Sequence, residues 1–431
     1  MDASQASGIM NQNITFYYGD RQRAGECRAL EQSFHGLGFS ISIAKNIEGS
    51  RWRQSLRRGL LRTLIYTEWS DRGSVTARTK LSRRTAWRQR ASCLAARLLP
   101  GDREALARRI DGLIPVYRVA YDYIRSVRPA LLLVVTDIYR GQEVELLKAA
   151  RRYGVPSLGV VGSWDTLTSK GSYLVKPDHL AVWGPAQADQ AVRLHGFAKE
   201  QVHVVGSLRL DSMPDLDLPH FLLREDRPVV MVAGTSISYW KHEEETVLEL
   251  AEAGSRIGYD VWYRPHPRRL GRLDGDLSVQ RSKWWAHGVY FDQGNGVEGE
   301  PERPGRLAGI LNRVRVVVTT FSTLAVEAAL QGTPSILMGF GASTGGAEPG
   351  HGLMMEHAGY EHMQEILKWP NISLAEGSLA VREVIAEYIR IKPTRLESES
   401  LRNNALEIVA ADGRASERML DLIRLLAGGH V

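Results

Sequence analysis

Short apolar runs alternate with longer amphipathic stretches along most of this chain. Runs rich in Val, Ile and Leu, such as 131–135, are typical of parallel strands that are covered on both faces. Strands that alternate with helices predict an α/β protein with mostly parallel sheets. We interpret the following ranges as strands: 14–18, 39–44, 130–136, 157–161, 179–183, 202–205, 229–233, 259–263 and 316–318.

The alternation breaks between 211 and 228, where three prolines and mixed charge predict a linker between domains. A length of 431 residues suits two or three domains. We therefore expect an N-terminal domain over 1–212, a linker over 213–227 and a second domain over 228–395. The tail over 396–431 has a helical pattern, and we expect it to pack back on the first domain.

Composition favours a globular cytoplasmic protein. Hydrophobic residues make up 43% and charged residues 24% of the chain, which is ordinary for this class. No apolar run approaches the roughly 20 residues that span a bilayer. The first residues do not combine a basic start with an apolar core, so we expect no secretory signal. Two cysteines, Cys27 and Cys93, predict neither a disulfide framework nor a metal-ligand cluster.

The net charge of +6 is concentrated in one segment. Residues 51–90 contain twelve Lys or Arg and two acids, a local +10 that leaves −4 for the rest of the chain. Because Trp and Leu are interleaved, this segment is a candidate for contact with anionic lipid at the inner face of the membrane, or with an anionic acceptor. One alternative is a solvated helical surface. The other is nucleic-acid binding, although no recognisable nucleic-acid-binding module accompanies the charge. We expect a helical insert over about 51–111.

The stretch from Val314 to Met338 predicts a buried strand, a polar turn, a helix and a second strand. Ser322 and Thr323 lie where the helix begins, and unpaired N–H groups and the helix dipole favour an anion there. Glu327 follows Thr323 by four residues, so both lie on one helix face. A hydroxyl near the phosphate, together with a carboxylate one turn deeper in the helix, would suit binding of the two ribose hydroxyls of a nucleotide. Alternatively, Glu327 solvates the helix.

Two further segments of the second domain are candidates for phosphate binding. Arg264 and His266 follow a predicted strand, where ligands of open α/β sheets bind. Arg can donate two hydrogen bonds to phosphate oxygens, and His can also donate to them. Gly234, Thr235 and Ser236 follow the first strand of this domain, and small residues let the backbone approach a phosphate. The same three residues also suit a plain strand-to-helix turn.

The loop over 162–171 of the first domain is rich in hydrogen-bonding groups. Asp165 is our general-base candidate, because a carboxylate can take the proton of an acceptor hydroxyl. Trp164 and Lys170 are acceptor-binding candidates, with Lys170 suited to a phosphate or carboxylate. The alternative for Asp165 is an Asx-type turn in which its side chain caps local N–H groups.

These motifs resemble those of known transferases. The element over 314–338 resembles the donor-nucleotide element of glycosyltransferases with two facing Rossmann-like domains, the GT-B fold. The YRPHP segment over 263–267 resembles the His-Pro motif of bacterial transferases that use cytidine-nucleotide donors. The loop over 162–171, with 178–184 and 204–211, resembles the CDP-glycerol glycerophosphotransferase and capsule Kdo-transferase group. The acidic motif of some sialyltransferases is missing.

The resemblance implies a GT-B-like α/β fold whose two parallel sheets face each other across a cleft. It implies an acceptor site on the first domain and a donor site on the second, with His266 also assisting the leaving group. The donor residues would be Thr235, Ser236, Arg264, His266, Ser322, Thr323 and Glu327.

The expected reaction moves a sugar or polyol phosphate from a nucleotide-activated donor, CMP or CDP type rather than UDP, to a cell-surface polysaccharide or lipid-linked acceptor. We expect no metal, since His242 lacks a second His four residues on, and no stored dinucleotide, since the G-x-G-x-x-G fingerprint is missing. One alternative is a UDP-N-acetylglucosamine 2-epimerase-like enzyme. The other is a non-catalytic protein that binds anionic lipid or nucleic acid through 51–90.

Overall fold

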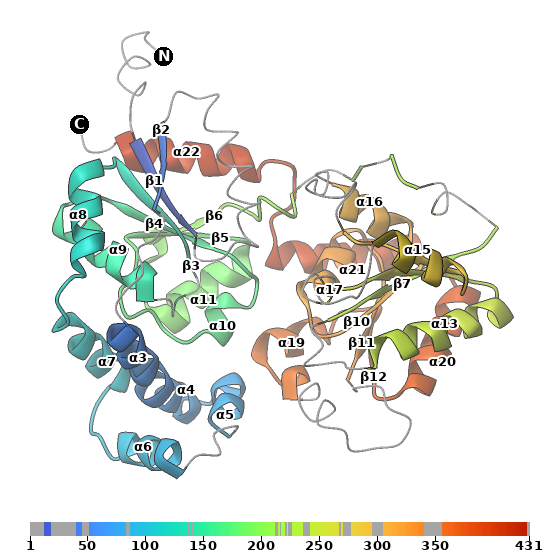
Figure 1. The fold of residues 1–431 in the computed structure, drawn as a ribbon, viewed down its shortest axis with the longest axis horizontal. Coiled ribbons are helices and arrows are strands. Elements are labelled where there is room, and N and C mark those ends of the chain that lie inside the picture. Colours follow the sequence, from blue (N-terminus) through green and yellow to red (C-terminus); the bar gives the residue numbers. More distant parts are fainter. Residues whose placement is uncertain are drawn as a thin grey trace, which may run out of the picture. The chain divides into compact units, whose positions relative to one another are not determined.

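The chain forms two compact units, each built on a parallel sheet (Figure 1). The first unit comprises 1–211 and 408–431, and the second comprises 212–407. The computed structural model describes residues 13–18, 40–44, 51–82, 87–136, 138, 141–211, 214–215, 217–219, 222, 226–235, 242–266, 269, 277–294, 305–339 and 356–428.

The sheet of the first unit has the strand order β2-β1-β3-β4-β5-β6, and its neighbouring strands all pair in parallel. Every residue of the central strand β3 is buried, as its continuous apolar sequence predicts. The strands are β1 (Asn13–Tyr18), β2 (Ser40–Ile43), β3 (Leu131–Thr136), β4 (Ser157–Val161), β5 (His179–Val182) and β6 (Val202–Val204).

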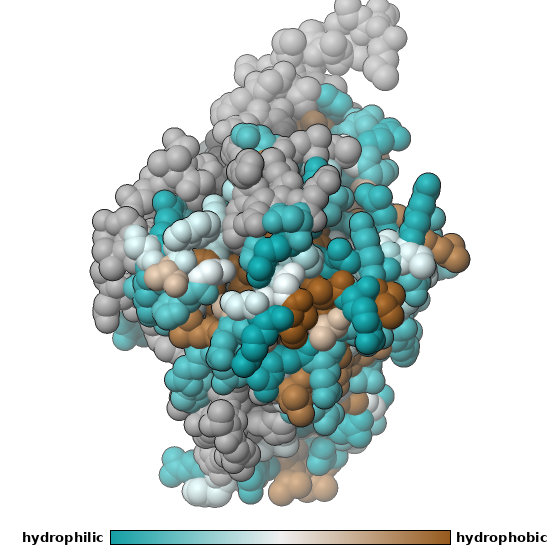
Figure 2. Space-filling model, turned by 90° about the vertical axis from the view of Figure 1, so that its right-hand side faces the viewer, coloured by the Kyte–Doolittle hydropathy of each residue, from teal (hydrophilic) through white to brown (hydrophobic). Residues whose placement is uncertain are grey.

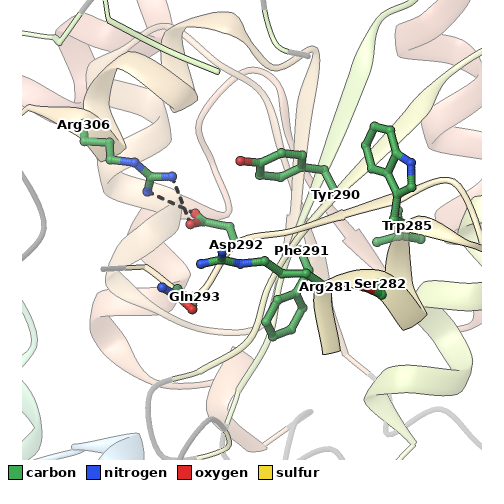
Figure 3. A pocket seen from close by; sticks show the side chains of 9 residues that line it. Arg281, Ser282, Trp285, Tyr290, Phe291, Asp292, Gln293 and Arg306 are labelled. Atoms are coloured by element: carbon green, nitrogen blue, oxygen red, sulfur yellow. Dashed lines mark hydrogen bonds and ion pairs between the residues drawn. The ribbon is translucent and has the colours of Figure 1, made fainter. Parts of the chain in front are cut away.

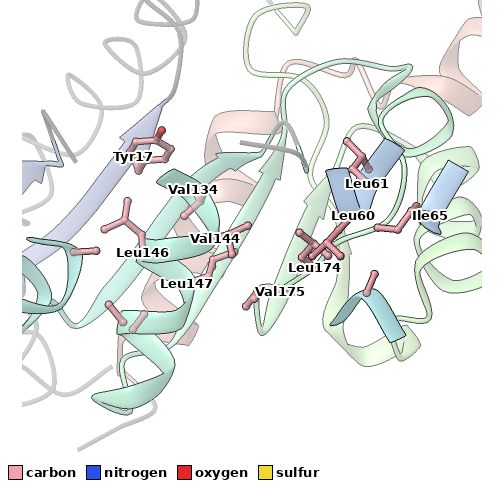
Figure 4. Close-up of a cluster of buried hydrophobic side chains, with 14 of the residues drawn as sticks. Tyr17, Leu60, Leu61, Ile65, Val134, Val144, Leu146, Leu147, Leu174 and Val175 are labelled. Carbon is pink, nitrogen blue, oxygen red and sulfur yellow. The ribbon is translucent and has the colours of Figure 1, made fainter. Parts of the chain in front are cut away.

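Helices cover both faces of this sheet. Met419 and Ile423 of α22 (Ala415–Gly428) pack with Phe16 and Leu133 on one face. Val144 and Leu147 of α9 pack with Tyr17 and Val134 on the other (Figure 4). The other helices outside the insert are α8 (Arg118–Val127), α9 (Gly141–Arg152), α10 (Thr166–Ser169), α11 (Pro185–His195) and the short 3₁₀ turn η3 (Lys199–Gln201).

Helices form between Arg51 and Gly112, where the sequence predicts an insert, and they contribute to the core of the first unit. Leu60, Leu61 and Ile65 are buried in the same cluster as Val134 (Figure 4). A Cβ on Gly171 would lie 2.6 Å from Leu61 Cδ1, so the insert packs this closely only because that residue is glycine. Its elements are α3 (Arg51–Leu60), the π-helical turn η2 (Leu61–Ile65), α4 (Tyr66–Asp71), α5 (Val75–Ser82), α6 (Trp87–Arg97) and α7 (Arg103–Gly112).

The sheet of the second unit has the order β12-β11-β10-β7-β8-β9, again with parallel neighbours throughout. The strands β9 and β12 are not among those predicted from the sequence. The strands are β7 (Val229–Ala233), β8 (Asp260–Arg264), β9 (Val289–Phe291), β10 (Val316–Thr319), β11 (Ser335–Met338) and β12 (Ile372–Ala375).

Alternate residues of these strands enter two separate cores. Val230 and Val318 pack with α13 and α20, whereas Met231 and Val317 pack with α16 and α17. The helix α21 lies in the second unit up to Glu407, while α22 lies in the first. The helices are α13 (Glu243–Ile257), α15 (Leu277–Trp285), α16 (Arg306–Arg313), α17 (Thr323–Leu330), α19 (Glu361–Ile366), α20 (Ser378–Arg390) and α21 (Arg395–Ile408).

The basic charge over 51–90 is partly neutralised inside the first unit. Arg57 is buried, and its Nε and Nη1 lie 2.6 Å from Asp111 and 2.8 Å from Glu145. Arg72 pairs with Glu68 at 3.0 Å and with Glu104 at 3.3 Å. Three of these four acids lie outside 51–90 in the sequence. The local charge count therefore overstates the charge that the insert presents to solvent.

The surface is mostly polar on the face shown in Figure 2, where hydrophobic residues gather only in small groups. Among the described residues, none of the helices combines the length and the apolar character that a membrane span requires.

His195 connects the insert with the loop that carries Asp165. Its Nε2 donates to the carbonyl of Leu167 at 2.8 Å, and its ring packs edge-on against Trp69 and Tyr173. Full burial penalises the imidazolium and lowers the pKa of His195 to about 4. The unfolded chain therefore binds a proton at a higher pH than the folded chain does, and acidification favours unfolding.

We expect His195 to cost about 2 kcal/mol of stability as the pH falls from about 7 to about 5. His195→Gln keeps a donor for Leu167 but cannot titrate, so the variant should lack this part of the pH dependence. Urea unfolding of both proteins at the two pH values measures the difference. An equal loss of stability in the two proteins would contradict the assignment.

Candidate functional site

The second sheet reverses its strand order between β7 and β10. From this pair the chain adds β8 and β9 on one side and β11 and β12 on the other. In open parallel sheets, ligands bind outside the carboxyl ends of the strands at such a switch point. Gly234 and Thr235 follow β7, and 320–323 follow β10, so both predicted loops flank it. Pro265 and His266 follow the neighbouring strand β8.

The helix after β10 begins where the sequence predicts. Ser322 is the N-cap of α17, and its Oγ accepts a hydrogen bond from the N–H of Leu324 at 3.3 Å. Its Oγ also lies 3.2 Å from Thr319 Oγ1. Ser322 and Thr323 are half-buried. Glu327 is only 8% exposed, so it does not serve to solvate the helix.

The loop after β7 rests on a buried carboxylate. Glu243, at the first position of α13, accepts from the Thr235 N–H and the Tyr263 hydroxyl, both at 2.7 Å. Arg269 Nε lies 3.2 Å from the same carboxylate. A Cβ on Gly234 would lie 2.0 Å from Glu243 Oε1, so only glycine fits there. The Thr235 N–H is therefore already bonded, and a ligand would meet the Thr235 hydroxyl instead.

Burial dominates the electrostatics of Glu243, whose side chain is fully enclosed. Burial raises the pKa of Glu243, although the Tyr263 hydroxyl and the Arg269 charge act in the opposite direction. The N–H of Arg269 also donates to the carbonyl of His266 at 2.7 Å. Glu243 thus connects the loop after β7 with the chain that follows the half-buried His266.

A second carboxylate, which the sequence analysis missed, lies at the end of β9. Asp292 accepts from Arg306 Nη2 at 3.1 Å (Figure 3). It also accepts from Arg264 Nη1 at 3.0 Å. Trp262 Nε1 also donates to it at 3.2 Å. Burial alone would raise the pKa of Asp292, but the two guanidinium groups outweigh it and hold the pKa below its ordinary value. Arg264 is therefore held by Asp292 at the carboxyl end of β8.

Asp292 and Arg306 line a cavity of about 450 Å³ (Figure 3). Tyr290 and Trp285 add aromatic surface to it, and Tyr290 stacks on Trp262 with ring centroids 4.1 Å apart. Gln293 adds a polar side chain. This volume and this mixture of aromatic, amide and charged groups lie within the range of small-molecule sites.

In the first unit, hydroxyl groups orient Asp165. Ser163 Oγ donates to one carboxylate oxygen at 2.5 Å, and Ser169 Oγ donates to the other at 2.7 Å. The side chain does not cap the helix that follows, so the Asx-type turn is not what holds it. Lys170 Nζ lies 3.9 Å from Asp165, and Lys80 of the insert donates to the Ser169 carbonyl. The carboxylate therefore lies between two hydroxyls, with the Lys170 ammonium group 3.9 Å away.

Buried side chains fix the backbone of this loop. Gln187 Nε2 donates to the carbonyls of Ser163 and Trp164 at 3.0 and 3.1 Å. Trp164, an acceptor-binding candidate, is only 5% exposed, which leaves little of its ring for a ligand. Lys170 keeps about a quarter of its side chain exposed.

The structure therefore groups the predicted residues in two places. Thr235, Arg264, His266, Ser322 and Thr323 gather at the carboxyl edge of the second sheet, with Glu327 one turn into α17. Trp164, Asp165 and Lys170 share one loop after β4. Ser236 lies outside the described residues. In the described part of the chain no three His, Cys, Asp or Glu side chains gather as a metal site requires, and metal independence stays a prediction.

No protein-family model matches this chain, and a search of curated proteins returns no match. Solved structures do match it. The S. aureus MnaA–UDP co-structure is 12% identical over 97% of each chain, with a TM-score of 0.52. The UDP-GlcNAc 2-epimerase from Neisseria meningitidis bound to UDP-GlcNAc is 10% identical over 95% of this chain and 99% of that one, with a TM-score of 0.50. The wall teichoic acid polymerase TagF gives 11% identity over 99% and 91%, with a TM-score of 0.48.

These similarities concern the fold. The α/β, GT-B-like class with two parallel sheets is confirmed, because two parallel sheets are present and the similar structures share this architecture. At 10–12% identity the comparisons do not assign an activity or a substrate to the chain.

Asp292 is a buried carboxylate that contacts the guanidinium groups of both Arg264 and Arg306. We expect Asp292→Asn to lower the free energy of unfolding by about 3 kcal/mol, because it removes the negative partner from two buried ion pairs. Glu252→Gln is the matched control. It removes an exposed partner of Arg256 in the same unit, and should change stability by less than about 0.5 kcal/mol. Denaturant unfolding of the three proteins tests this, and similar losses in both variants would count against a structural role for Asp292.

Proposed function

We propose that this protein is an enzyme that binds a nucleotide-activated donor on its second unit and transfers the donor's sugar, or a polyol phosphate, to an acceptor hydroxyl. The acceptor is a cell-surface polysaccharide or a lipid-linked glycan. The observation that carries the proposal is the gathering of the predicted donor residues at one switch point. Thr235, His266 and Ser322 follow three neighbouring strands there.

The donor phosphates would lie at the start of α17. Ser322 and Thr323 offer hydroxyls there, and the unpaired N–H groups of a helix start favour negative charge. His266 would donate to the departing phosphate, and Glu327, one turn deeper, would accept from the ribose. Arg264, held by Asp292 at the same edge, would donate hydrogen bonds to phosphate oxygens.

The nucleoside suits the cavity beside Asp292. A flat base can stack on the aromatic side chains there, and Gln293 offers both a donor and an acceptor for its edge. The identity of the base follows from the nucleotide panel described below. The motif resemblance favours CMP or CDP, whereas the S. aureus MnaA structure contains UDP and the Neisseria meningitidis epimerase structure contains UDP-GlcNAc.

Asp165 would act as the general base on the acceptor hydroxyl. The two serine hydroxyls hold its carboxylate in one orientation, as a positioned base requires. Lys170 and Lys80 would attract a phosphate or carboxylate of the acceptor to the same loop. As the proton moves to Asp165, the acceptor oxygen would form a bond to the transferred sugar carbon or phosphorus. The bond between that atom and the nucleotide would break, and the nucleotide would leave with its electron pair.

A second candidate function is a UDP-N-acetylglucosamine 2-epimerase-like activity. The observation that favours it is that UDP-GlcNAc 2-epimerases are among the structures most similar in fold. An epimerase needs no acceptor and releases no free nucleotide at steady state. Incubation with UDP-GlcNAc alone distinguishes the two, because an epimerase changes the sugar while the nucleotide sugar stays intact.

We expect one nucleotide from a panel of CMP, CDP, UDP, GDP and AMP to raise the melting temperature of the protein by several degrees. His266→Ala and Glu327→Gln should each weaken its binding about tenfold or more, because each removes a hydrogen bond that involves a charged group. His287→Ala, an exposed histidine of the same unit, should bind normally. Failure of every nucleotide to shift the wild-type protein would favour a non-catalytic binding protein.

We expect Asp165→Asn to lower turnover about 100-fold or more while it changes donor affinity by less than about twofold. The amide keeps an acceptor for the neighbouring serine hydroxyls, so the loop should remain folded. Asp189→Asn, in an exposed ion pair of α11, is the control. Turnover is measured as nucleotide released with acceptor present, and full activity in Asp165→Asn would exclude this residue as the base.

A further inference from the structure

A second cavity of the second unit, about 420 Å³ in volume, lies at the opposite edge of the sheet from the donor residues. Its lining residues 227–228, 312–315 and 331–334 directly precede β7, β10 and β11. Because these three strands are parallel, their amino ends meet at one edge of the sheet, and the loops that follow them meet at the other. The cavity is therefore separate from the proposed donor site.

The side chains that line this cavity are strongly basic. Its described lining contains four cations and no acid, namely Arg227, Arg313, Arg315 and Lys392. Arg227 Nε lies 3.0 Å from the carboxylate of Asp260, which offsets its charge. Within the described parts of the chain, no carboxylate pairs with Arg313, Arg315 or Lys392. The cavity thus has three cations whose charge no ion pair offsets.

Arg315 is fixed where β10 begins. Its backbone N–H donates to the carbonyl of Val229 at 2.7 Å, and its Nη1 donates to the carbonyl of Tyr388 at 3.4 Å. The residue is half-buried, and this burial lowers the pKa of Arg315. Since a guanidinium keeps its charge in proteins, an anion in the cavity would compensate for the hydration that Arg315 has lost.

Close backbone packing builds the wall of the cavity. Gly332 has φ of 71°, and a Cβ there would lie 3.0 Å from the carbonyl oxygen of Ser398. Glycine suits this left-handed turn, which brings the end of α17 against the first turn of α21. Thr333 Oγ1 donates to the carbonyl of Leu311 at 2.6 Å and joins the same turn to α16. These contacts fix α16, α17 and α21 around the cavity.

The lining favours a ligand that combines a phosphate group with a polar organic part. Arginine donates pairs of hydrogen bonds to phosphate oxygens, and a phosphate monoester carries about two negative charges at neutral pH. Asn312 and Gln331 add amides, which donate to hydroxyls or accept from them. The volume lies within the range of small-molecule sites and exceeds what one phosphate group fills. A sugar phosphate has this combination of charge and hydroxyls.

We propose that this cavity binds a small sugar phosphate, with Arg313, Arg315 and Lys392 around its phosphate group. The amides of Asn312 and Gln331 would bind the sugar hydroxyls. The site goes beyond the proposed function and does not rest on it, because none of the described donor or acceptor residues lines this cavity.

The test is isothermal titration calorimetry of the full chain with glucose 6-phosphate, inorganic phosphate and glucose as probes. We expect glucose 6-phosphate to bind with an affinity that salt weakens, inorganic phosphate to bind about tenfold more weakly, and glucose not to bind. The double variant Arg313→Gln, Lys392→Gln should lower the affinity for glucose 6-phosphate about tenfold or more, because it removes two charged donors. Both side chains are exposed, so the variant should keep the wild-type melting temperature.

The matched control is Arg256→Gln, Lys368→Gln, which removes the same charge from two exposed positions of the same unit. It should bind glucose 6-phosphate as the wild type does. No binding of glucose 6-phosphate by the wild type, equal binding of glucose, or equal losses in the two double variants would each overturn the proposal. So would inorganic phosphate that binds as tightly as glucose 6-phosphate, since the sugar would then add nothing.

The donor residues provide a second comparison, which separates this proposal from the proposed function. His266→Ala should keep the wild-type affinity for glucose 6-phosphate, and the cavity variant should keep the nucleotide-induced melting shift. If His266→Ala loses glucose 6-phosphate while the cavity variant keeps it, the phosphate has bound at the donor edge and the proposal fails. If no nucleotide shifts the wild type while the cavity variant loses glucose 6-phosphate, the donor assignment fails and this proposal stands.

Discussion

Parallel pairing of the strands is the constraint on which both candidate sites depend. Parallel neighbours need crossover connections, so every strand of a sheet delivers its following loop to the same edge. In the second sheet Val230 lies opposite Val316, although the chain builds β8 and β9 between them. The loops after β7 and β10 are neighbours for this reason alone. No local property of either loop brings Thr235 close to Ser322.

Buried carboxylates then fix the loops at two of these strand ends. Glu143 and Glu243 lie in the first turn of the helix that follows β3 and β7, and both are buried. Glu143 accepts from the Thr136 hydroxyl, which itself accepts from the N–H of Ile138. Ile138 has φ of 68°, a conformation that β-branched residues rarely adopt, so the bonds around it hold a strained turn. Since a buried carboxylate is stable only when such partners satisfy it, each loop and its acid depend on one another.

The sequence predicts those features that depend on neighbouring residues. Continuous apolar runs predict the central strands. The start of α17 is predicted at Ser322 or Thr323, because a capping hydroxyl and the helix it caps adjoin in sequence, and the structure identifies Ser322 as the cap. The roles of Glu243 and Asp292 were missed, because their partners come from other elements. Asp292 alone does not show that Arg264 and Arg306 will converge on it. The strand β9 is three residues long, which is too short for a periodic pattern to identify.

The insert shows why a charge count along the sequence is a weak guide to a surface. Its twelve cations over 51–90 include Arg57, which is buried because Asp111 and Glu145 reach it from later elements. A buried ion pair of this kind fixes the position of the insert on the first unit and adds little to the field outside. A cation therefore contributes to the field outside the protein only where no acid from another element reaches it, and the order of residues along the chain does not show which cations these are.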